Sequence, residues 1–166
     1  MTIPELYLLE FDEEMPGTRK ILERVPDHSF SWKPHEKSMS LGRLASHVAD
    51  LPARCASIIT TDMLVRPPGF SPYMAATASE LLEHFDTTTA AARAALVDLR
   101  EDQLSDLWTI KLGDRVMGAF PRVMALRRVF MNHLIHHRGQ LGVFLRLLDV
   151  PIPGLYGPSA DEQSRM

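Results

Sequence analysis

Cysteine is nearly absent from this chain of 166 residues, in which Cys55 stands alone. An intramolecular disulfide is therefore excluded, and a lone thiol suits a reducing cytoplasm. Long hydrophobic runs are lacking too, because no apolar stretch approaches the roughly 20 residues of a membrane span. The start of the chain turns acidic at Asp12-Glu13-Glu14 and does not have the pattern of a signal peptide. We expect a cytoplasmic protein without a membrane partner.

Basic charge is neither abundant nor clustered. The chain has 18 Lys and Arg against 21 Asp and Glu, for a formal net charge of −3. A nucleic-acid-binding surface needs a basic stripe, so no nucleic-acid partner is expected. Two further motifs are missing: there is no Gly-x-Ser-x-Gly elbow and no Gly-rich phosphate loop before a helix. Serine-esterase and nucleotide-binding functions therefore have no support.

The chain does contain four amphipathic segments with helical periodicity, at about 4–24, 40–58, 77–99 and 121–148. Thr2-x-x-Glu5 and Thr77-x-x-Glu80 have the spacing of capping boxes, and Pro121 suits a first helical turn. Pro16-Gly17 predicts a kink or break in the first helix, and Pro52 predicts a bend in the second.

The expected fold is all-α, a four-helix bundle formed by one domain over residues 1–166. Residues 107–120 alternate apolar and polar residues around Gly113-Asp114, which predicts a short extended or hairpin element before the last long helix. The tail, 154–166, has no periodicity and is either docked on the bundle or a partner, or frayed.

Histidines on the last predicted helix are the strongest functional signal. His133 and His137 are four residues apart and project from one face, where two imidazole nitrogens can share a metal ion. The alternative is that each imidazole makes a hydrogen bond within the core. His47 stands among the apolar residues of the second helix and is a candidate third ligand, although spacing alone does not show that it meets the pair. Asp50 and Gln140 are weaker candidates for orienting a ligand or a bound water.

Three motifs together resemble the DinB/YfiT-like family. They are Ser40-Leu41-Gly42-Arg43-Leu44-Ala45-Ser46-His47, then His133-x-x-His136-His137-Arg138-Gly139-Gln140, and finally Tyr156-Gly157-Pro158-Ser159-Ala160-Asp161-Glu162. The resemblance covers nearly the whole chain. It implies a four-helix bundle, commonly a homodimer, with one divalent metal ion, nickel or zinc, held by His47, His133 and His137.

Three functions remain open for such a site. By resemblance to relatives that use bacillithiol or mycothiol, the first is a metal-dependent transferase that joins a low-molecular-weight thiol to a small electrophilic substrate. The second is a metal-dependent hydrolase of a small ester or amide, which is disfavoured because no inward carboxylate is an obvious proton shuttle. A zincin peptidase is disfavoured as well, because Leu134 stands where that motif has its glutamate. The third is a non-catalytic metal-binding protein of stress or structural type, whose fourth ligand would be Asp161 or Glu162.

Two residues beside the pair have less certain roles. His136 lies 100° around the helix from His137, so we expect it to pack against a neighbouring helix or a dimer partner. Arg138 is either a solvated or paired charge, or an anion contact at the rim of the site. Cys55 is expected in the core rather than as a nucleophile.

Overall fold

The structure is a computed structural model that describes residues 1–163. Its helices are α1 (Ile3–Leu22), α2 (Leu41–Thr60), α3 (Ala78–Val97), α4 (Arg122–Ala125), α5 (Asn132–Leu147) and α6 (Ala160–Gln163). Its strands are β1 (Met63–Arg66), β2 (Leu107–Leu112) and β3 (Arg115–Pro121). Short 3-10 turns occupy Asp27–Ser29 and Glu101–Ser105.

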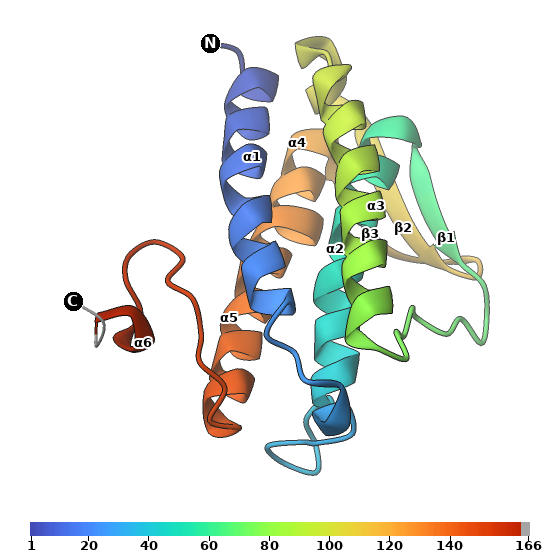
Figure 1. The fold of residues 1–166 in the computed structure, drawn as a ribbon. Coiled ribbons are helices and arrows are strands. Elements are labelled where there is room, and N and C mark those ends of the chain that lie inside the picture. Colours follow the sequence, from blue (N-terminus) through green and yellow to red (C-terminus); the bar gives the residue numbers. More distant parts are fainter. Residues whose placement is uncertain (164–166) are drawn as a thin grey trace.

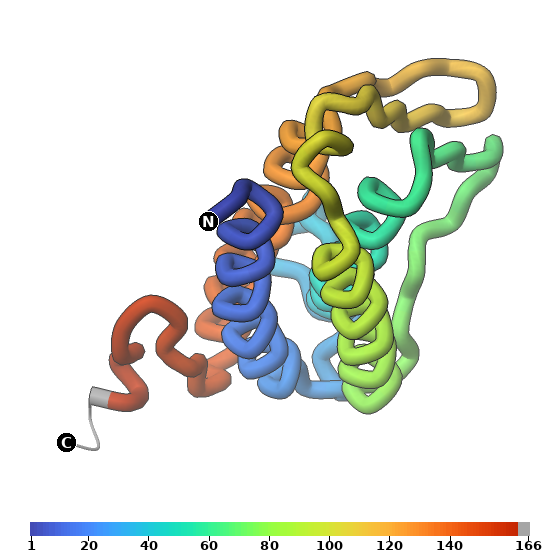
Figure 2. Tube along the Cα trace, turned by 90° about the horizontal axis from the view of Figure 1, so that it is seen from above, coloured from blue at the N-terminus to red at the C-terminus, as the bar shows by residue number. Residues whose placement is uncertain are grey.

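The long helices form the predicted four-helix bundle. Figure 1 shows α1 and α3 in front of α2 and the α4–α5 segment, with the sheet at one side. Seen from above, the helices surround a common centre (Figure 2), and each packs on two neighbours: α1 on α3 and α5, and α2 on α3 and α5. The core between them is aliphatic and aromatic, and it contains the fully buried Cys55 as expected. No described helix is long and apolar enough to cross a membrane.

The helix starts follow from side-chain capping. Thr2 and Glu5 form the complete capping box at α1, and Ser40 Oγ accepts a hydrogen bond from Arg43 N at α2. At α3, half of the predicted capping box forms: Thr77 accepts from the backbone of Glu80, whereas the Glu80 carboxylate accepts from the backbone N–H of Ala76 rather than that of Thr77. Of the kink or break expected at Pro16, the break does not occur: α1 is continuous from Ile3 to Leu22. Burial of one face of α1 against α3 and α5 outweighs the one backbone hydrogen bond that proline removes.

The predicted hairpin is present as β2 and β3, joined at Gly113-Asp114, where Gly113 has a φ of +55°. A third strand, β1, was not predicted. It pairs in parallel with β2, from Met63 opposite Thr109 to Arg66 opposite Leu112. A strand of four residues is too short for its alternation of apolar and polar residues to be recognised in the sequence. Its pairing also depends on a partner strand more than forty residues away.

The last long helix contains a π-helical segment, η3 (Leu126–Met131), between α4 and α5. Pro121 lies at the end of β3, just outside the helix rather than in its first turn. In the π-helical segment, backbone hydrogen bonds span five residues instead of four, which changes which backbone carbonyls have a partner within the helix. The Leu126 carbonyl accepts a hydrogen bond of 2.7 Å from the Tyr7 hydroxyl of α1. The segment directly precedes the helix that carries His133 and His137.

The described part of the tail, 154–163, is docked on the bundle. Tyr156 donates from its hydroxyl to the Glu14 carboxylate of α1, at 2.8 and 2.9 Å. Asp161 accepts from Arg146 of α5, and Glu162 accepts from the backbone of Gly154 and Ser159. The remaining positions of the predicted tail, 164–166, lie outside the described residues.

Candidate metal centre

Three histidines from two neighbouring helices meet on one side of the bundle. His47 comes from α2, and His133 and His137 come from successive turns of α5. The ring centroids are 4.9 Å apart for His47 and His133, 4.6 Å for His47 and His137, and 4.7 Å for His133 and His137. One ligand nitrogen from each ring lies within 4.8 Å of the other two. The structure therefore places His47 against the pair, which the sequence spacing left open.

Hydrogen bonds fix which nitrogen of each α5 histidine faces the centre. His133 Nδ1 lies 3.3 Å from the Val129 carbonyl, beside the π-helical turn. His137 Nδ1 lies 2.8 Å from Oε1 of Gln140. Carbonyl oxygens only accept, so both Nδ1 atoms carry the proton and both Nε2 atoms present a lone pair. Gln140 thus has the orienting contact that the sequence suggested.

Burial, assisted by nearby positive charge, lowers the pKa of each of the three imidazoles. Burial, followed by the nearby Arg54 guanidinium, lowers the pKa of His47 to about 3 and that of His133 to about 4. Burial also lowers the pKa of His137, although its hydrogen bond to Gln140 acts in the opposite direction. A neutral imidazole is the form that binds metal.

One nitrogen–nitrogen distance in the triad matches that of two ligands on a single metal ion. His47 Nε2 and His133 Nε2 are 3.2 Å apart, and two nitrogens that each lie about 2.0–2.1 Å from a tetrahedral zinc are roughly 3.3 Å apart. A single hydrogen bond between the two atoms also gives this distance, but it leaves the Nε2 lone pair of His137 without a partner. Among residues 1–163, this triad is the one group of three or more His, Cys, Asp or Glu side chains with metal-binding geometry.

Asp50 lies three residues beyond His47 but contacts a different histidine. Its Oδ1 is 3.1 Å from His84 Nε2, and the His84 ring stacks on Tyr73 at 3.7 Å between centroids. The bond joins α2 to α3, and Asp50 is not part of the three-histidine group. His84 was given no role from sequence, because a polar histidine on α3 does not reveal that α2 packs beside it.

The other histidine and arginine of the motif lie elsewhere on α5. His136 is exposed, and its ring meets that of His137 edge-on at 4.9 Å. Arg138 is buried on the opposite side, where it pairs with Glu14 at 2.6 Å and donates to Thr18. It is therefore a paired charge in the core and not an anion contact at the rim of the site.

The tail carboxylates do not complete the triad. Asp161 and Glu162 bind Arg146 and the tail backbone, and neither joins the metal-binding group. The closed four-ligand site considered from sequence is therefore contradicted for these two residues.

Two arginines beside the triad are functional candidates that the sequence reasoning did not identify. Arg43 precedes His47 by one helical turn of α2, and Arg54 follows it by two turns, so both share its face. The spacing was a usable signal, but arginines at such positions usually extend into solvent.

Comparison with known proteins gives the family. The DinB family profile matches residues 2–166. The chain is 27% identical to the uncharacterised protein YrdA of Bacillus subtilis over 161 residues, covering 96% of this chain and 91% of that protein. It is 31% identical to the uncharacterised protein YjoA of the same organism over 132 residues, covering 78% and 80% of the two chains.

Solved structures agree on the fold. The crystal structure of the DinB-like protein YjoA from Bacillus subtilis superposes with a TM-score of 0.66 at 23% identity, covering 89% of this chain and 96% of that one. A DinB-like protein from Bacillus cereus gives 0.69 at 22% identity, covering 92% and 97%. With a profile that spans nearly the whole sequence and a matching bundle, this chain belongs to the DinB family.

Proposed function

We propose that this protein binds one divalent metal ion, nickel or zinc, through His47, His133 and His137, and that it transfers a low-molecular-weight thiol to a small electrophile. The observation that carries the proposal is a three-histidine group with no carboxylate in it. Three neutral ligands leave the ion its full charge and at least one open position. Such an ion lowers the pKa of a thiol or water that it binds and polarises a substrate oxygen.

The residues around the triad favour thiol transfer over hydrolysis. Hydrolysis needs a base that takes a proton from water, and the nearest carboxylate on α2, Asp50, is engaged by His84. A thiolate needs no such base, and the Arg54 guanidinium favours the anionic form of a nearby group. In the transfer, the sulfur forms a bond to the electrophilic carbon, the leaving group departs with its electron pair, and the thiol proton passes to solvent.

His133 and His137 are held in position before any ligand arrives. Their Nδ1 atoms are bound by Val129 and Gln140, so the Nε2 lone pairs need no reorientation. His47 is 8% exposed and packed in the core of α2, whereas the two α5 rings are half-buried. A substrate therefore approaches from the side of α5.

Elemental analysis tests the metal site first. Protein purified without a histidine tag should contain near-stoichiometric nickel or zinc, and the His133→Ala/His137→Ala variant should contain none. Equal metal content in both proteins would refute the ligand assignment.

Cobalt substitution tests the thiol. A thiol that binds the metal should produce a sulfur-to-cobalt charge-transfer absorption band, and the loaded protein should accelerate conjugation of that thiol to 1-chloro-2,4-dinitrobenzene with release of chloride. If no thiol perturbs the cobalt spectrum while p-nitrophenyl acetate is hydrolysed, the hydrolase replaces the transferase. If neither reaction occurs, the site is non-catalytic. Homodimerisation stays a prediction for sedimentation analysis.

A further inference from the structure

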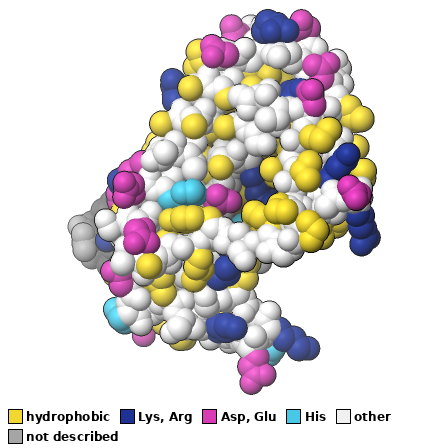
Figure 3. All heavy atoms as spheres, turned by 90° about the vertical axis from the view of Figure 1, so that its right-hand side faces the viewer, with side chains coloured by type: hydrophobic (Ala, Val, Ile, Leu, Met, Phe, Trp, Pro, Cys, Tyr) yellow, Lys and Arg dark blue, Asp and Glu magenta, His cyan; other side chains and the backbone are white. Residues whose placement is uncertain are grey.

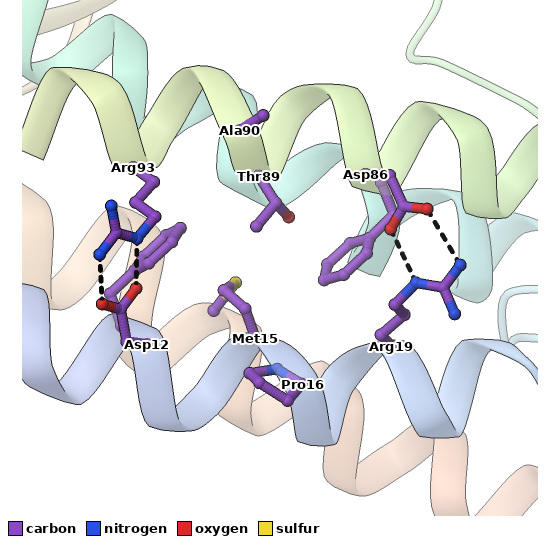
Figure 4. A pocket seen from close by; sticks show the side chains of 10 residues that line it. Asp12, Met15, Pro16, Arg19, Asp86, Thr89, Ala90 and Arg93 are labelled. Carbon is purple, nitrogen blue, oxygen red and sulfur yellow. Dashed lines mark hydrogen bonds and ion pairs between the residues drawn. The ribbon is translucent and has the colours of Figure 1, made fainter.

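Arginines on one face of the bundle are fully paired. In the groove between α1 and α3 (Figure 4), Arg19 and Arg93 each make a two-bond ion pair, with Asp86 and Asp12 respectively. The four hydrogen bonds measure 2.8 to 3.0 Å. The groove has a volume of about 390 Å³ and is otherwise mainly apolar. Its charges are satisfied, and it shares no residue with the triad.

Arginines beside the triad are not paired. Arg43, His47 and Arg54 follow one another at intervals of four and seven residues, so they lie along one face of α2. In the described chain, neither guanidinium makes a hydrogen bond or an ion pair, and Nη1 of Arg43 is buried without a partner. A half-buried cation without an anion is costly, because water no longer solvates it fully.

A third arginine extends this charge beyond α2. Arg54 and Arg66 line a cavity of about 170 Å³ between α2 and β1, together with Asp50 and Phe70. The Arg66 guanidinium lies over the Phe70 ring at 5.1 Å, which orients it. Figure 3 shows Lys or Arg side chains set back in a hollow of this face, with hydrophobic side chains along its rim.

The cavity has an excess of positive charge. Asp50 is its one acidic lining residue, and that carboxylate is bound by His84. Burial, with the adjacent Arg66 next in importance, lowers the pKa of Arg54 to about 10. An anion placed between the guanidinium groups would relieve this repulsion, and planar guanidinium groups match carboxylate and phosphate oxygens with paired hydrogen bonds.

We propose that Arg43, Arg54 and Arg66, the arginine cluster, bind an anionic group of the molecule that reacts at the histidine triad. The thiol substrate is then an acidic one, with a carboxylate or phosphate group at a short distance from its sulfur. This identification of the substrate rests on the proposed thiol transfer, whereas anion binding by the arginine cluster does not.

Anion binding is tested first on the metal-free protein by calorimetry, with succinate and with inorganic phosphate as separate probes. The wild type should bind at least one of them, and the preferred probe identifies the group as carboxylate or phosphate. Arg54→Gln and Arg66→Gln should each weaken binding at least tenfold, and Arg54→Lys should recover part of it. Arg24→Gln, at an exposed arginine near the docked tail, is the matched control. No binding of either anion, or equal affinity in all variants, would overturn the proposal.

The link to the triad is tested on the cobalt-substituted protein. Mercaptosuccinate and the uncharged 1-thioglycerol should both produce the charge-transfer band, with mercaptosuccinate at least tenfold tighter. Arg66→Gln should reduce that preference below threefold and leave the affinity for 1-thioglycerol unchanged. Equal affinity for both thiols in the wild type would refute the arginine role and leave the thiol chemistry intact. No band with either thiol, alongside anion binding by the metal-free protein, would refute the thiol chemistry and support the arginine cluster.

Discussion

His137 and Arg138 are consecutive residues of α5 that belong to opposite kinds of polar site. The Arg138 guanidinium is paired within the chain: it contacts the Glu14 carboxylate, the Glu14 carbonyl and the Thr18 hydroxyl. Around His137, three imidazoles converge, and among residues 1–163 the contact between their inward nitrogens joins His47 to His133. One cluster is complete within the chain, and the other is a group that could hold a metal ion.

The difference separates structural from functional polar groups. A buried charge that is fully hydrogen-bonded orders the elements that supply its partners. Here these are α1, α5 and the tail, through Tyr156. Buried nitrogen lone pairs that converge without a hydrogen-bond partner raise the free energy of the folded state. Such groups are candidates for a binding site. Each prediction below changes one of the two clusters and examines whether the other responds.

Arg138→Met should have the largest effect on stability. The substitution leaves the Glu14 carboxylate buried without its cation, which costs about 3–5 kcal/mol of the free energy of unfolding. Urea denaturation measures the loss, and metal content per folded chain should remain that of the wild type. A variant that is stable but free of metal would show that the two clusters are not separate.

The His133→Ala/His137→Ala variant should have the opposite profile. It should lose the metal ion, and its melting temperature should fall to that of the wild type treated with a chelator. The reason is linkage: a ligand at 1,000 times its Kd stabilises the folded state by about 4 kcal/mol. His136→Ala on the exposed face is the control and should retain metal. A melting temperature far below that of the chelated wild type would indicate that the imidazoles also support the core.

Gln140→Ala should weaken metal binding without abolishing it. The substitution removes the acceptor that holds His137 Nδ1 at 2.8 Å, and loss of such a partner reduces affinity by roughly 10- to 100-fold. Competition with a chromophoric chelator measures the change. Gln140→Glu preserves an acceptor oxygen and should retain most of the affinity, and an unchanged affinity in the alanine variant would remove Gln140 from the site.

Tyr156→Phe should have the smallest effect. Tyr156 is 74% exposed, so the variant loses mainly the hydrogen bonds of its hydroxyl, which donates to Glu14 and accepts from Arg138. Each such bond is worth about 1 kcal/mol, and Glu14 and Arg138 still pair with each other. Limited proteolysis should show faster cleavage of the tail, while metal affinity and anion binding remain unchanged. A loss of metal here would connect the tail to the triad, against the separation in the structure.

Local features were predictable because they depend on nearby residues. The Thr2 and Thr77 caps, the helical periodicity and the hairpin at Gly113-Asp114 each involve contacts within a few positions of the chain. The pairing of His133 with His137 is local for the same reason, since one helical turn separates them. These features also sufficed to predict the bundle.

Contacts between distant segments were decided only by the tertiary structure. His47 meets His133 across 86 positions, and Arg138 reaches the Glu14 carbonyl across 124. Neither spacing says which face of α5 meets α2 and which meets α1. Consecutive residues therefore become a candidate metal ligand, His137, and a member of a buried ion pair, Arg138. By itself the sequence determined which helices form and which histidine and arginine side chains lie on each helix. The packing of α5 between α1 and α2 decided which polar groups found partners within the chain and which converged as candidate metal ligands, because burial sets the cost of an unpaired group.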